Sequence, residues 1–226
     1  AEPIEDLKKQ IVGETSVFLN GERGDVRTKE TNLGNLIADG MLWKARQSVD
    51  ATIAITNGGS IRASIDEGEI TLGEVLTTMP FGNTIVSLDL TGEEIVHALE
   101  HGVGAVEDVE GRFPQVAGLN FAYNPSLPSG QRVVEVTVLG EDGNDEPIDL
   151  TKTYTVATNA FMADGGDGYD MFAKAKTEGR IDELGFVDYE VFNEYLQAHG
   201  TVSPQVEGRI VVTDGKPGEG QDTTAP

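Results

Sequence analysis

The sequence predicts an α+β fold, and three observations lead to that class. Segments with helical periodicity interleave with short β-rich runs along the chain. Several neighbouring β-rich runs look antiparallel, which favours α+β over a doubly wound α/β sheet. With 226 residues, of which 38% are hydrophobic and 24% charged, the chain has the composition of a globular protein with one sizeable core or two modest ones. We therefore expect sheets covered by helices.

The chain begins with a segment that we interpret as a connector. "EDLKKQIVGETSVFL" starts with helix-forming residues and becomes β-rich, which predicts a short helix and then a strand. Residues 1–15 are assigned to an interdomain connector helix and residues 16–213 to the domain. A helix is expected over residues 32–46, because four apolar side chains recur there at helical spacing: Leu33, Leu36, Ile37 and Met41. The apolar run "ATIAIT" then ends in "NGG", the pattern of a buried strand that feeds a loop.

Two capping boxes indicate the starts of the next helices. Thr71 with Glu74 opens "TLGEVLTTM", and Thr91 with Glu94 opens "TGEEIVHALEHGV". "TIVSLDL" between them alternates like a strand. Four further strands are expected in "LNFAYN", "VVEVTVL", "TYTVATN" and "GRIVV", and a last helix in "VDYEVFNEYLQAHG". Residues 214–226 are Gly, Pro and polar residues, which predicts a disordered tail or a linker.

A glycine-rich stretch, "TNAFMADGGDGYDMF", follows the strand predicted to end at residue 158. Gly165, Gly166 and Gly168 fall within four positions. Glycine suits backbone that takes a positive φ or allows a close approach, so the spacing predicts a bent, crowded loop before a following helix. The flanking Phe161 and Asp167 can stack on a ring and accept hydrogen bonds from hydroxyls, respectively.

The charge balance excludes several classes of partner. Sixteen basic and thirty-nine acidic residues give a formal charge of −23, which repels nucleic acid and anionic lipid at long range. The chain has no cysteine, so disulfides and thiol catalysis are excluded. No stretch approaches the roughly 20 apolar residues that span a bilayer. We expect neither a nucleic-acid partner nor membrane insertion.

The sequence contains no recognisable set of catalytic residues. His97 and His101 are spaced i, i+4, yet no H-E-x-x-H pattern or carboxylate cluster accompanies them, so metal binding is not expected. There is no G-x-S-x-G nucleophile elbow, no G-x-G-x-x-G, no P-loop and no aspartate and histidine cluster for two metals. We therefore expect no catalytic residue, metal or cofactor in this chain.

Four separated stretches have the composition of binding loops. They are "GDVRTKETNLGN", "TNGGSIRASI", "MPFGNT" and the glycine-rich stretch, and their candidate residues are Arg27, Asn57, Arg62, Phe81, Phe161 and Asp167. Two rings can sandwich a planar base for about 1–3 kcal/mol per stacked base. The arginines can recognise phosphate, Asp167 can accept the hydroxyls of a ribose, and Asn57 can read a base edge. Taken singly, the arginines also fit surface ion pairs and the phenylalanines also fit a core.

Four motifs in this order resemble the C-terminal domain of the 5'-nucleotidase family. They are "ETNLGNLIADGM", "ITNGGSIRASI", "MPFGNTIVSLDLTGEEI" and "TNAFMADGGDGYDMF", and the resemblance extends from about Phe18 to Val212. The family includes periplasmic UDP-sugar hydrolase/5'-nucleotidases and animal ecto-5'-nucleotidase. The resemblance implies a mixed sheet with helices and a secreted protein that is extracellular, periplasmic or at the cell surface.

The resemblance also implies a division of labour between two domains. The family's N-terminal metallophosphatase domain binds two divalent metal ions and carries the catalytic residues, and the C-terminal domain supplies the nucleotide pocket. The stacking phenylalanines match Phe81 and Phe161, the pocket asparagine matches Asn57, the arginines match Arg27 and Arg62, and the ribose-binding aspartate matches Asp167. Asp164 stands where relatives often have asparagine. This chain alone is accordingly predicted to be inactive.

Other functions remain open at this point. A 2',3'-cyclic-nucleotide phosphodiesterase has the same architecture, as does the thiosulfohydrolase of sulfur oxidation, although the latter should not need two base-stacking rings. A nucleotide- or sugar-binding module without catalysis is the alternative from a different class. An upstream set of D-x-H, G-N-H-[DE] and G-H-x-H motifs in the gene would distinguish the enzymes from the module.

Overall fold

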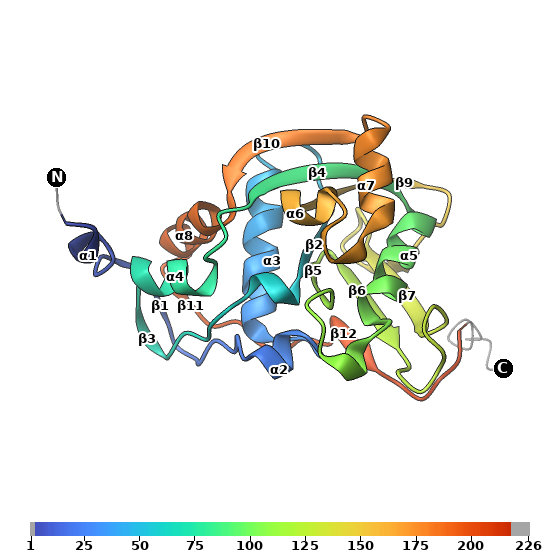
Figure 1. Ribbon diagram of the computed structural model, residues 1–226, viewed down its shortest axis with the longest axis horizontal. Helices are drawn as coiled ribbons and strands as arrows, with labels where there is room; N and C mark the ends of the chain where they lie inside the picture. Colours follow the sequence, from blue (N-terminus) through green and yellow to red (C-terminus); the bar gives the residue numbers. More distant parts are fainter. Residues whose placement is uncertain (1–2, 218–226) are drawn as a thin grey trace.

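A computed structural model describes residues 3–217 and arranges them in three sheets with helices around them (Figure 1). The central sheet has the order β10-β4-β9-β2-β5, with strands Ile181–Val187, Thr84–Thr91, Thr153–Asn159, Ile53–Asn57 and Pro114–Ala117. The second has the order β12-β6-β7-β8, with strands Ile210–Val212, Leu119–Tyr123, Val133–Leu139 and Asp145–Pro147. The third, β11-β1-β3, consists of Thr201–Val202, Ile11–Thr15 and Gly68–Thr71. Each sheet contains parallel and antiparallel pairs, so the predicted α+β class is confirmed.

Helices cover both faces of the central sheet. The longer ones are α3 (Asn32–Ala45), α5 (Gly92–Val103), α7 (Asp170–Thr177) and α8 (Asp188–His199). The shorter ones are α1 (Ile4–Leu7), α2 (Arg23–Val26), α4 (Leu72–Thr78) and α6 (Ala160–Ala163). Single 3₁₀ turns occupy Gly58–Ser60, Val106–Asp108 and Gly166–Gly168. Figure 1 shows α3 on one side of the central sheet, with α5 and α7 on the other.

The central sheet separates two hydrophobic cores. β2 is buried at all five positions: Ile53 and Ile55 belong to the core that α5 and α7 share, and Ala54 belongs to the core beneath α3 and α8. A strand covered on both faces needs apolar side chains at successive positions, which accounts for its unbroken apolar run. Burial of each large aliphatic side chain contributes about 1.5–3 kcal/mol, so this sheet forms a rigid base for the loops at its ends.

Most of the elements expected from periodicity and capping are observed. α3 ends at Ala45, one residue before the predicted end. Both capping boxes form: the Glu74 N–H donates to Thr71 Oγ1 at 3.2 Å, and the Glu94 N–H donates to Thr91 Oγ1 at the same distance. The runs expected as strands correspond to β2, β4, β6, β7, β9 and β12, and the last predicted helix corresponds to α8.

The connector segment differs from its prediction. Only Ile4–Leu7 of residues 3–15 is helical, whereas Ile11–Thr15 forms β1 and pairs with both β3 and β11. Val12 and Thr15 are buried in this sheet, and that burial favours a strand over a continued helix. The folded unit therefore begins before the predicted boundary at residue 16. Of the predicted tail, 218–226 lie outside the described residues, as do residues 1–2 of the connector.

The strands without a sequence expectation are short, polar or at sheet edges. β8 consists of three exposed residues, and β10, "IDELGFV", carries two acidic residues at one edge of the central sheet. β5 forms the opposite edge and starts at Pro114, a residue tolerated at an edge because it has no N–H to donate. β3 and β11 are four and two residues long. Their pairing comes from tertiary contacts rather than from a local pattern.

The strand directions bring loops that are distant in the sequence to one end of the central sheet. β2 and β9 are parallel, so Asn57 and Asn159 at their carboxyl ends lie at the same end of the sheet. β4 runs antiparallel to β9 and pairs Ile85 with Asn159, which places the segment before β4 beside them. β5 pairs Pro114 with Asn57 and adds the segment that precedes β5. The candidate binding loops therefore lie around this end of the central sheet.

Candidate binding site

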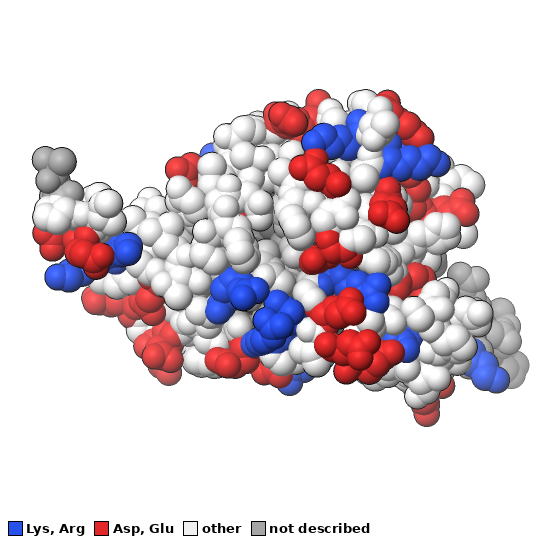
Figure 2. Space-filling view, viewed as in Figure 1, with Lys and Arg blue, Asp and Glu red and all other residues white. Residues whose placement is uncertain are grey.

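The loops at the end of the central sheet where β2 and β9 finish enclose a pocket of about 480 Å³, which we call the ligand pocket. All six residues singled out from the sequence line it: Arg27, Asn57, Arg62, Phe81, Phe161 and Asp167. The remaining wall residues are Gly59, Ser60, Asn83 and Gly111. Figure 2 shows a cluster of basic side chains near the middle of the viewed face, with acidic side chains directly beside it. Loops on a rigid scaffold are where binding residues concentrate, so the geometry fits a ligand site.

Two exposed phenylalanines belong to this pocket. Phe81 is 57% exposed and Phe161 is 42% exposed, although this residue type is usually buried. Phe161 lies in α6, whose start is capped by Asn159: the Asn159 Oδ1 accepts a hydrogen bond from the Met162 N–H at 2.9 Å. A Cβ at Gly166 would lie 2.6 Å from the Phe161 ring, so glycine lets the chain turn closely against that ring. The fold thus holds two rings at the surface.

Two arginines line the pocket without a carboxylate partner. The Arg27 side chain is nearly buried, and its Nη1 donates to the Val109 carbonyl at 3.4 Å. Arg62 Nη1 donates to the Gly59 carbonyl at 3.4 Å, and its guanidinium carbon lies 5.6 Å from the centre of the Phe81 ring. Neither arginine forms an ion pair with a carboxylate among residues 3–217, although the chain has 39 acidic residues.

The electrostatic environment of Arg27 favours an anionic ligand. Burial lowers the pKa of the Arg27 guanidinium, repulsion from Arg23 and Arg62 lowers it further, and Asp167 acts in the opposite direction. An anion between the guanidiniums would relieve this repulsion and supply hydrogen-bond acceptors. Phosphate has the negative charge and the adjacent oxygens to which the planar arginine fork can donate two hydrogen bonds.

A buried amide network orients the Asp167 carboxylate. Asn57 is 3% exposed, and its Nδ2 donates to Asp167 Oδ2 at 2.8 Å. Asn159 Nδ2 donates to Asn57 Oδ1 at 3.0 Å, so both ends of the Asn57 amide are used within the protein. One Nδ2 hydrogen of Asn57 is left for a ligand, so the expectation that Asn57 reads a base edge stays a prediction. The structure places it to aim Asp167 at the pocket, and the second oxygen of Asp167 stays available to a ligand.

The main chain at Asp167 is held in an unusual conformation. Asp167 has φ 56° and ψ 18°, in the left-handed region, and lies between Gly165 and Gly168, which also have positive φ. The Asp167 carbonyl accepts a hydrogen bond from His101 Nε2 at 2.7 Å. A Cβ at Gly168 would lie 2.8 Å from the His101 ring, so the loop packs closely on this histidine. The bent, crowded loop expected from the glycines is observed.

His101 contacts the main chain of Asp167, and the sequence analysis did not predict this contact. It lies on α5, 66 positions before Asp167, and only the tertiary fold brings the two together. Because a carbonyl can only accept, Nε2 carries the hydrogen and Nδ1 is left as the acceptor for Arg112 Nη1 at 3.4 Å. No local pattern in the sequence marks this pairing.

The backbone that carries Arg27 is anchored from β5. Gln115 is fully buried, and its Nε2 donates to the carbonyls of Val26 at 3.0 Å and Lys29 at 2.8 Å. Its Oε1 accepts from the Thr31 N–H at 3.3 Å. One side chain therefore fixes the segment between α2 and α3 on both sides of Arg27.

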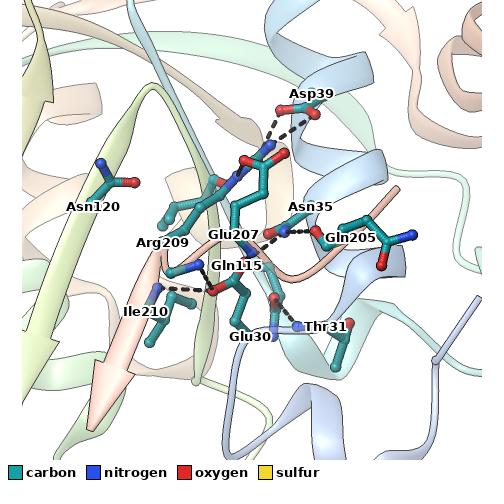
Figure 3. Close-up of polar contacts among 12 residues, drawn as sticks. Glu30, Thr31, Asn35, Asp39, Gln115, Asn120, Gln205, Glu207, Arg209 and Ile210 are labelled. Atoms are coloured by element: carbon teal, nitrogen blue, oxygen red, sulfur yellow. Dashed lines mark hydrogen bonds and ion pairs between the residues drawn. The ribbon is translucent and has the colours of Figure 1, made fainter. Parts of the chain in front are cut away.

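A second network ties the same segment to the end of the domain (Figure 3). The buried Glu30 carboxylate accepts from Asn35 Nδ2 at 2.7 Å and from the backbone N–H groups of positions 207, 208 and 210. Arg209 donates through both terminal nitrogens to Asp39 on α3, at 2.8 and 2.9 Å. These hydrogen bonds offset the cost of burying the Glu30 carboxylate, and Asp39 pairs with the Arg209 guanidinium. The network holds the loop of Arg27 rigid relative to α3.

The described residues offer no site for a metal ion. Residues 3–217 contain no group of three or more His, Cys, Asp or Glu side chains placed to hold one. His97 is exposed on α5, whereas His101 contacts the Asp167 loop, so the i, i+4 pair does not converge on a common ligand. No helix in this part of the chain has the length and apolar character needed to cross a membrane.

Comparisons of the sequence with known proteins identify related 5'-nucleotidases and nucleotide phosphoesterases. The sequence model of one family, described as "5'-nucleotidase, C-terminal domain", matches residues 11–174. The chain is 54% identical over 208 residues to the trifunctional nucleotide phosphoesterase protein YfkN of Bacillus subtilis, covering 92% of this chain and 14% of that protein. It is 35% identical over 225 residues to snake venom 5'-nucleotidase of Macrovipera lebetinus, covering 94% and 54% of the two chains.

A solved structure shows the same architecture. The 5'-nucleotidase precursor of Thermus thermophilus superposes with a TM-score of 0.90 at 48% identity, covering 95% of this chain and 42% of the other. This chain therefore spans about half or less of the length of these relatives. Both the matched family and the extent of the match show that the chain belongs to the 5'-nucleotidase family, as its C-terminal domain.

Proposed function

We propose that this chain is the substrate-recognition domain of a secreted, metal-dependent 5'-nucleotidase that hydrolyses nucleoside phosphates to nucleoside and phosphate. The observation that carries the proposal is the ligand pocket, which combines two exposed rings, two arginines without ion pairs and the oriented Asp167. A base between the rings, a ribose at Asp167 and a phosphate toward the arginines would use each of these groups.

The binding energy comes from different groups for each part of the nucleotide. Stacking on Phe81 and Phe161 is sequence-tolerant and contributes about 1–3 kcal/mol per stacked base. The free oxygen of Asp167 can accept a ribose hydroxyl, a hydrogen bond to a charged group that contributes about 1.5–3 kcal/mol. The arginines bind the phosphate and leave the opposite side of that phosphate open to a second domain.

Hydrolysis itself is assigned to a domain outside this chain. We expect a metallophosphatase domain of the same protein to supply two divalent metal ions and the catalytic residues. The family match and the partial coverage of the relatives support this division, and the described residues contain no metal-ligand set that fits such ions. The isolated chain should therefore release no phosphate from any nucleotide with any added metal.

The proposed location is based on a relative, and the proposed partners are based in part on the net charge. One relative is named as a snake venom enzyme, which supports an extracellular, periplasmic or cell-surface location here. The formal charge of −23 disfavours nucleic acid as a partner. The expected partners are a nucleotide or nucleoside and the metallophosphatase domain.

Calorimetric titration of adenosine and adenine into the isolated chain tests the recognition role. Phe161→Ala should weaken both ligands by about tenfold to a hundredfold, because both use the ring. Phe18→Ala is the matched control, since Phe18 is 47% exposed but does not line the ligand pocket. Equal losses in the two variants, or no binding at millimolar nucleoside, would contradict the proposal.

A phosphate-release screen of the full-length protein tests the reaction. Nucleoside 5'-monophosphates should be hydrolysed only when a divalent metal is present. A preference for 2',3'-cyclic nucleotides would instead identify a cyclic phosphodiesterase. Absence of turnover, together with intact nucleoside binding, would identify a binding module without catalysis.

A further inference from the structure

Val109 has a main-chain conformation that its residue type rarely adopts. Its φ is 56° and its ψ is 41°, in the left-handed region. A β-branched residue meets steric repulsion there, and within residues 3–217 the other non-glycine residue with positive φ is Asp167 of the ligand pocket. Strained main chain concentrates at functional sites and persists where its surroundings hold it. Val109 is therefore a candidate for a role in the pocket, although it does not line that pocket.

The chain is anchored on both sides of Val109. Before it, the Glu107 carboxylate accepts two hydrogen bonds from the Arg132 guanidinium, at 2.7 and 3.0 Å. After it, the Gly111 carbonyl accepts a hydrogen bond from the Gly59 N–H at 2.9 Å. Tertiary contacts therefore impose the left-handed turn between these anchors, since valine as a residue type does not favour it.

The turn directs one carbonyl at Arg27. The Val109 carbonyl accepts a hydrogen bond from Arg27 Nη1 at 3.4 Å, and this is the only hydrogen bond of the Arg27 side chain within residues 3–217. A carbonyl occupies one donor of a guanidinium without neutralising its charge. The strained residue thus holds Arg27 in place and leaves its charge for a ligand.

Arg27 and Asp167 approach the same short stretch of chain. A Cβ at Gly111 would lie 3.7 Å from the Arg27 guanidinium carbon and 3.5 Å from Asp167 Oδ2. Burial lowers the pKa of Arg27 and the Asp167 charge raises it, so the two groups attract each other. They form no ion pair in the part of the chain that the structure describes, because the Val109 carbonyl holds one and the Asn57 amide holds the other. An ion pair would occupy the donors and the acceptor that a nucleotide needs.

We propose that Val109 is a positioning residue, whose left-handed main chain holds Arg27 away from Asp167 so that both stay available to the nucleotide. The inference rests on the proposed function, because it takes a phosphate to bind Arg27 and a ribose to bind Asp167. Two preferences then depend on one turn of the main chain. Arg27 provides the preference for AMP over adenosine, and Asp167 provides the preference for adenosine over adenine.

Val109→Pro tests the turn, because proline fixes φ at about −65° and excludes the left-handed conformation. Titration of the isolated chain at low salt gives the affinities for adenine, adenosine and AMP. In the wild type we expect AMP to bind about three- to tenfold more tightly than adenosine. Val109→Pro should abolish this gain and reduce the preference for adenosine over adenine, since Arg27 can then reach Asp167. Val109→Gly should keep both preferences, because glycine adopts positive φ without strain.

Gly143→Pro is the matched control. Gly143 has a φ of 82°, and its N–H donates to the carbonyl three residues earlier at 3.0 Å, as the Val109 N–H does at 3.1 Å. It lies in the exposed turn between β7 and β8, where a Cβ would meet no atom within 4 Å. Gly143→Pro should therefore keep both preferences. Equal losses in the two proline variants, or a loss in Val109→Gly as large as in Val109→Pro, would overturn the inference.

A measurement without ligand separates the inference from the function on which it rests. The NMR signal of the Arg27 Nε–H is recorded with and without Asp167→Ala, in the wild-type and Val109→Pro backgrounds. The shift that Asp167→Ala causes should be larger in Val109→Pro, because only there does Arg27 pair with Asp167. A larger shift supports the inference even if no nucleotide binds. Equal shifts in the two backgrounds would overturn it even if nucleotides do bind.

Glu107→Ala provides the same test if Val109→Pro does not fold, because it removes the carboxylate that anchors the turn on one side. The AMP gain should fall in this variant. Adding Val109→Gly should restore the gain, since glycine keeps the left-handed conformation without that anchor. Retention of the full gain in Glu107→Ala, or a loss that Val109→Gly does not restore, would contradict the positioning role of Val109.

Discussion

The two ends of the ligand pocket are built in opposite ways. At the ring end, Phe81 and Phe161 are exposed, and neither packs against another aromatic ring of residues 3–217. At the polar end, Asn57 is buried and Asp167 is held by hydrogen bonds to its side chain and to its main chain. The ring end gains most of its contacts only when a ligand arrives. The polar end is oriented before a ligand arrives.

The difference indicates how the pocket divides affinity from selectivity. A ring accepts any flat ligand, so exposed phenylalanines give affinity with little discrimination. A fixed carboxylate discriminates, because a ligand without hydroxyls leaves its acceptor unpaired in a partly dry site. The network behind Asp167 reduces the ordering cost of that contact. Variants at the polar end should therefore change which ligands bind, and variants at the ring end should change how tightly all of them bind.

The largest effect at the polar end is expected from Asp167→Ala. Adenosine should bind about tenfold to a hundredfold more weakly, because its ribose loses a hydrogen bond to a charged acceptor. Adenine should be unaffected, since it has no hydroxyl for the carboxylate. Calorimetry with both ligands measures the ratio. Equal weakening of adenine and adenosine in a folded variant would remove the distinction between the two ends.

A smaller effect in the same direction is expected from His101→Ala. The variant frees the Asp167 carbonyl and loosens its left-handed backbone, so adenosine should bind up to about tenfold more weakly while adenine keeps its affinity. His101→Gln restores a donor at similar reach and should recover most of the loss. Thermal unfolding provides the structural control. Loss of both ligands in parallel with stability would show that His101 supports the fold and not the orientation of Asp167.

The smallest effect concerns the support of the ring end. The Asp188 N–H donates to the Asn83 carbonyl at 2.8 Å and so anchors the loop of Phe81 on α8. Burial raises the pKa of the Asp188 carboxyl to about 6, above its usual range, so between about pH 4 and pH 6 the folded state holds a proton that the unfolded state has lost. This group therefore stabilises the fold at low pH, and the contribution is lost as pH rises through 6.

Asp188→Asn should remove that pH dependence. At pH 7 the variant should be more stable than the wild type by about 1 kcal/mol, because no charge is buried, and the difference should vanish near pH 4. Urea unfolding at a series of pH values measures the difference. A constant difference across this range would show that Asp188 does not titrate in the window.

The elements that the sequence predicts well have strong local signals. The helix at residues 32–46 and the two capping boxes were predictable because apolar spacing and cap residues act within a few positions. β5 and β10 escaped prediction because they are edge strands with a proline or with acidic residues. A short helix followed by a strand is observed at the start of the chain, but the strand begins before the predicted boundary at residue 16, because the β-branched Val12 and Thr15 are buried in its sheet.

The sequence predicts which residues line the ligand pocket, but it does not predict the hydrogen bonds that connect them to one another. Residue types at the ends of elements, together with the family resemblance, suffice to select six residues that the structure brings into one pocket. Their roles remain predictions. The contacts from Asn57 and His101 to Asp167 depend on how β2, α5 and the glycine-rich loop meet in space, and nothing near either residue in the sequence indicates them.

The most direct test of nucleoside recognition is the measurement of intermolecular NOEs between adenosine and the isolated chain. We predict NOEs from the adenine H2 and H8 protons to the ring protons of both Phe81 and Phe161, and none from the base to Phe18. The ribose protons should give NOEs to the segment around Asp167. Base NOEs to any other surface, or ribose protons against the two rings, would contradict the assignment of this pocket to a nucleoside.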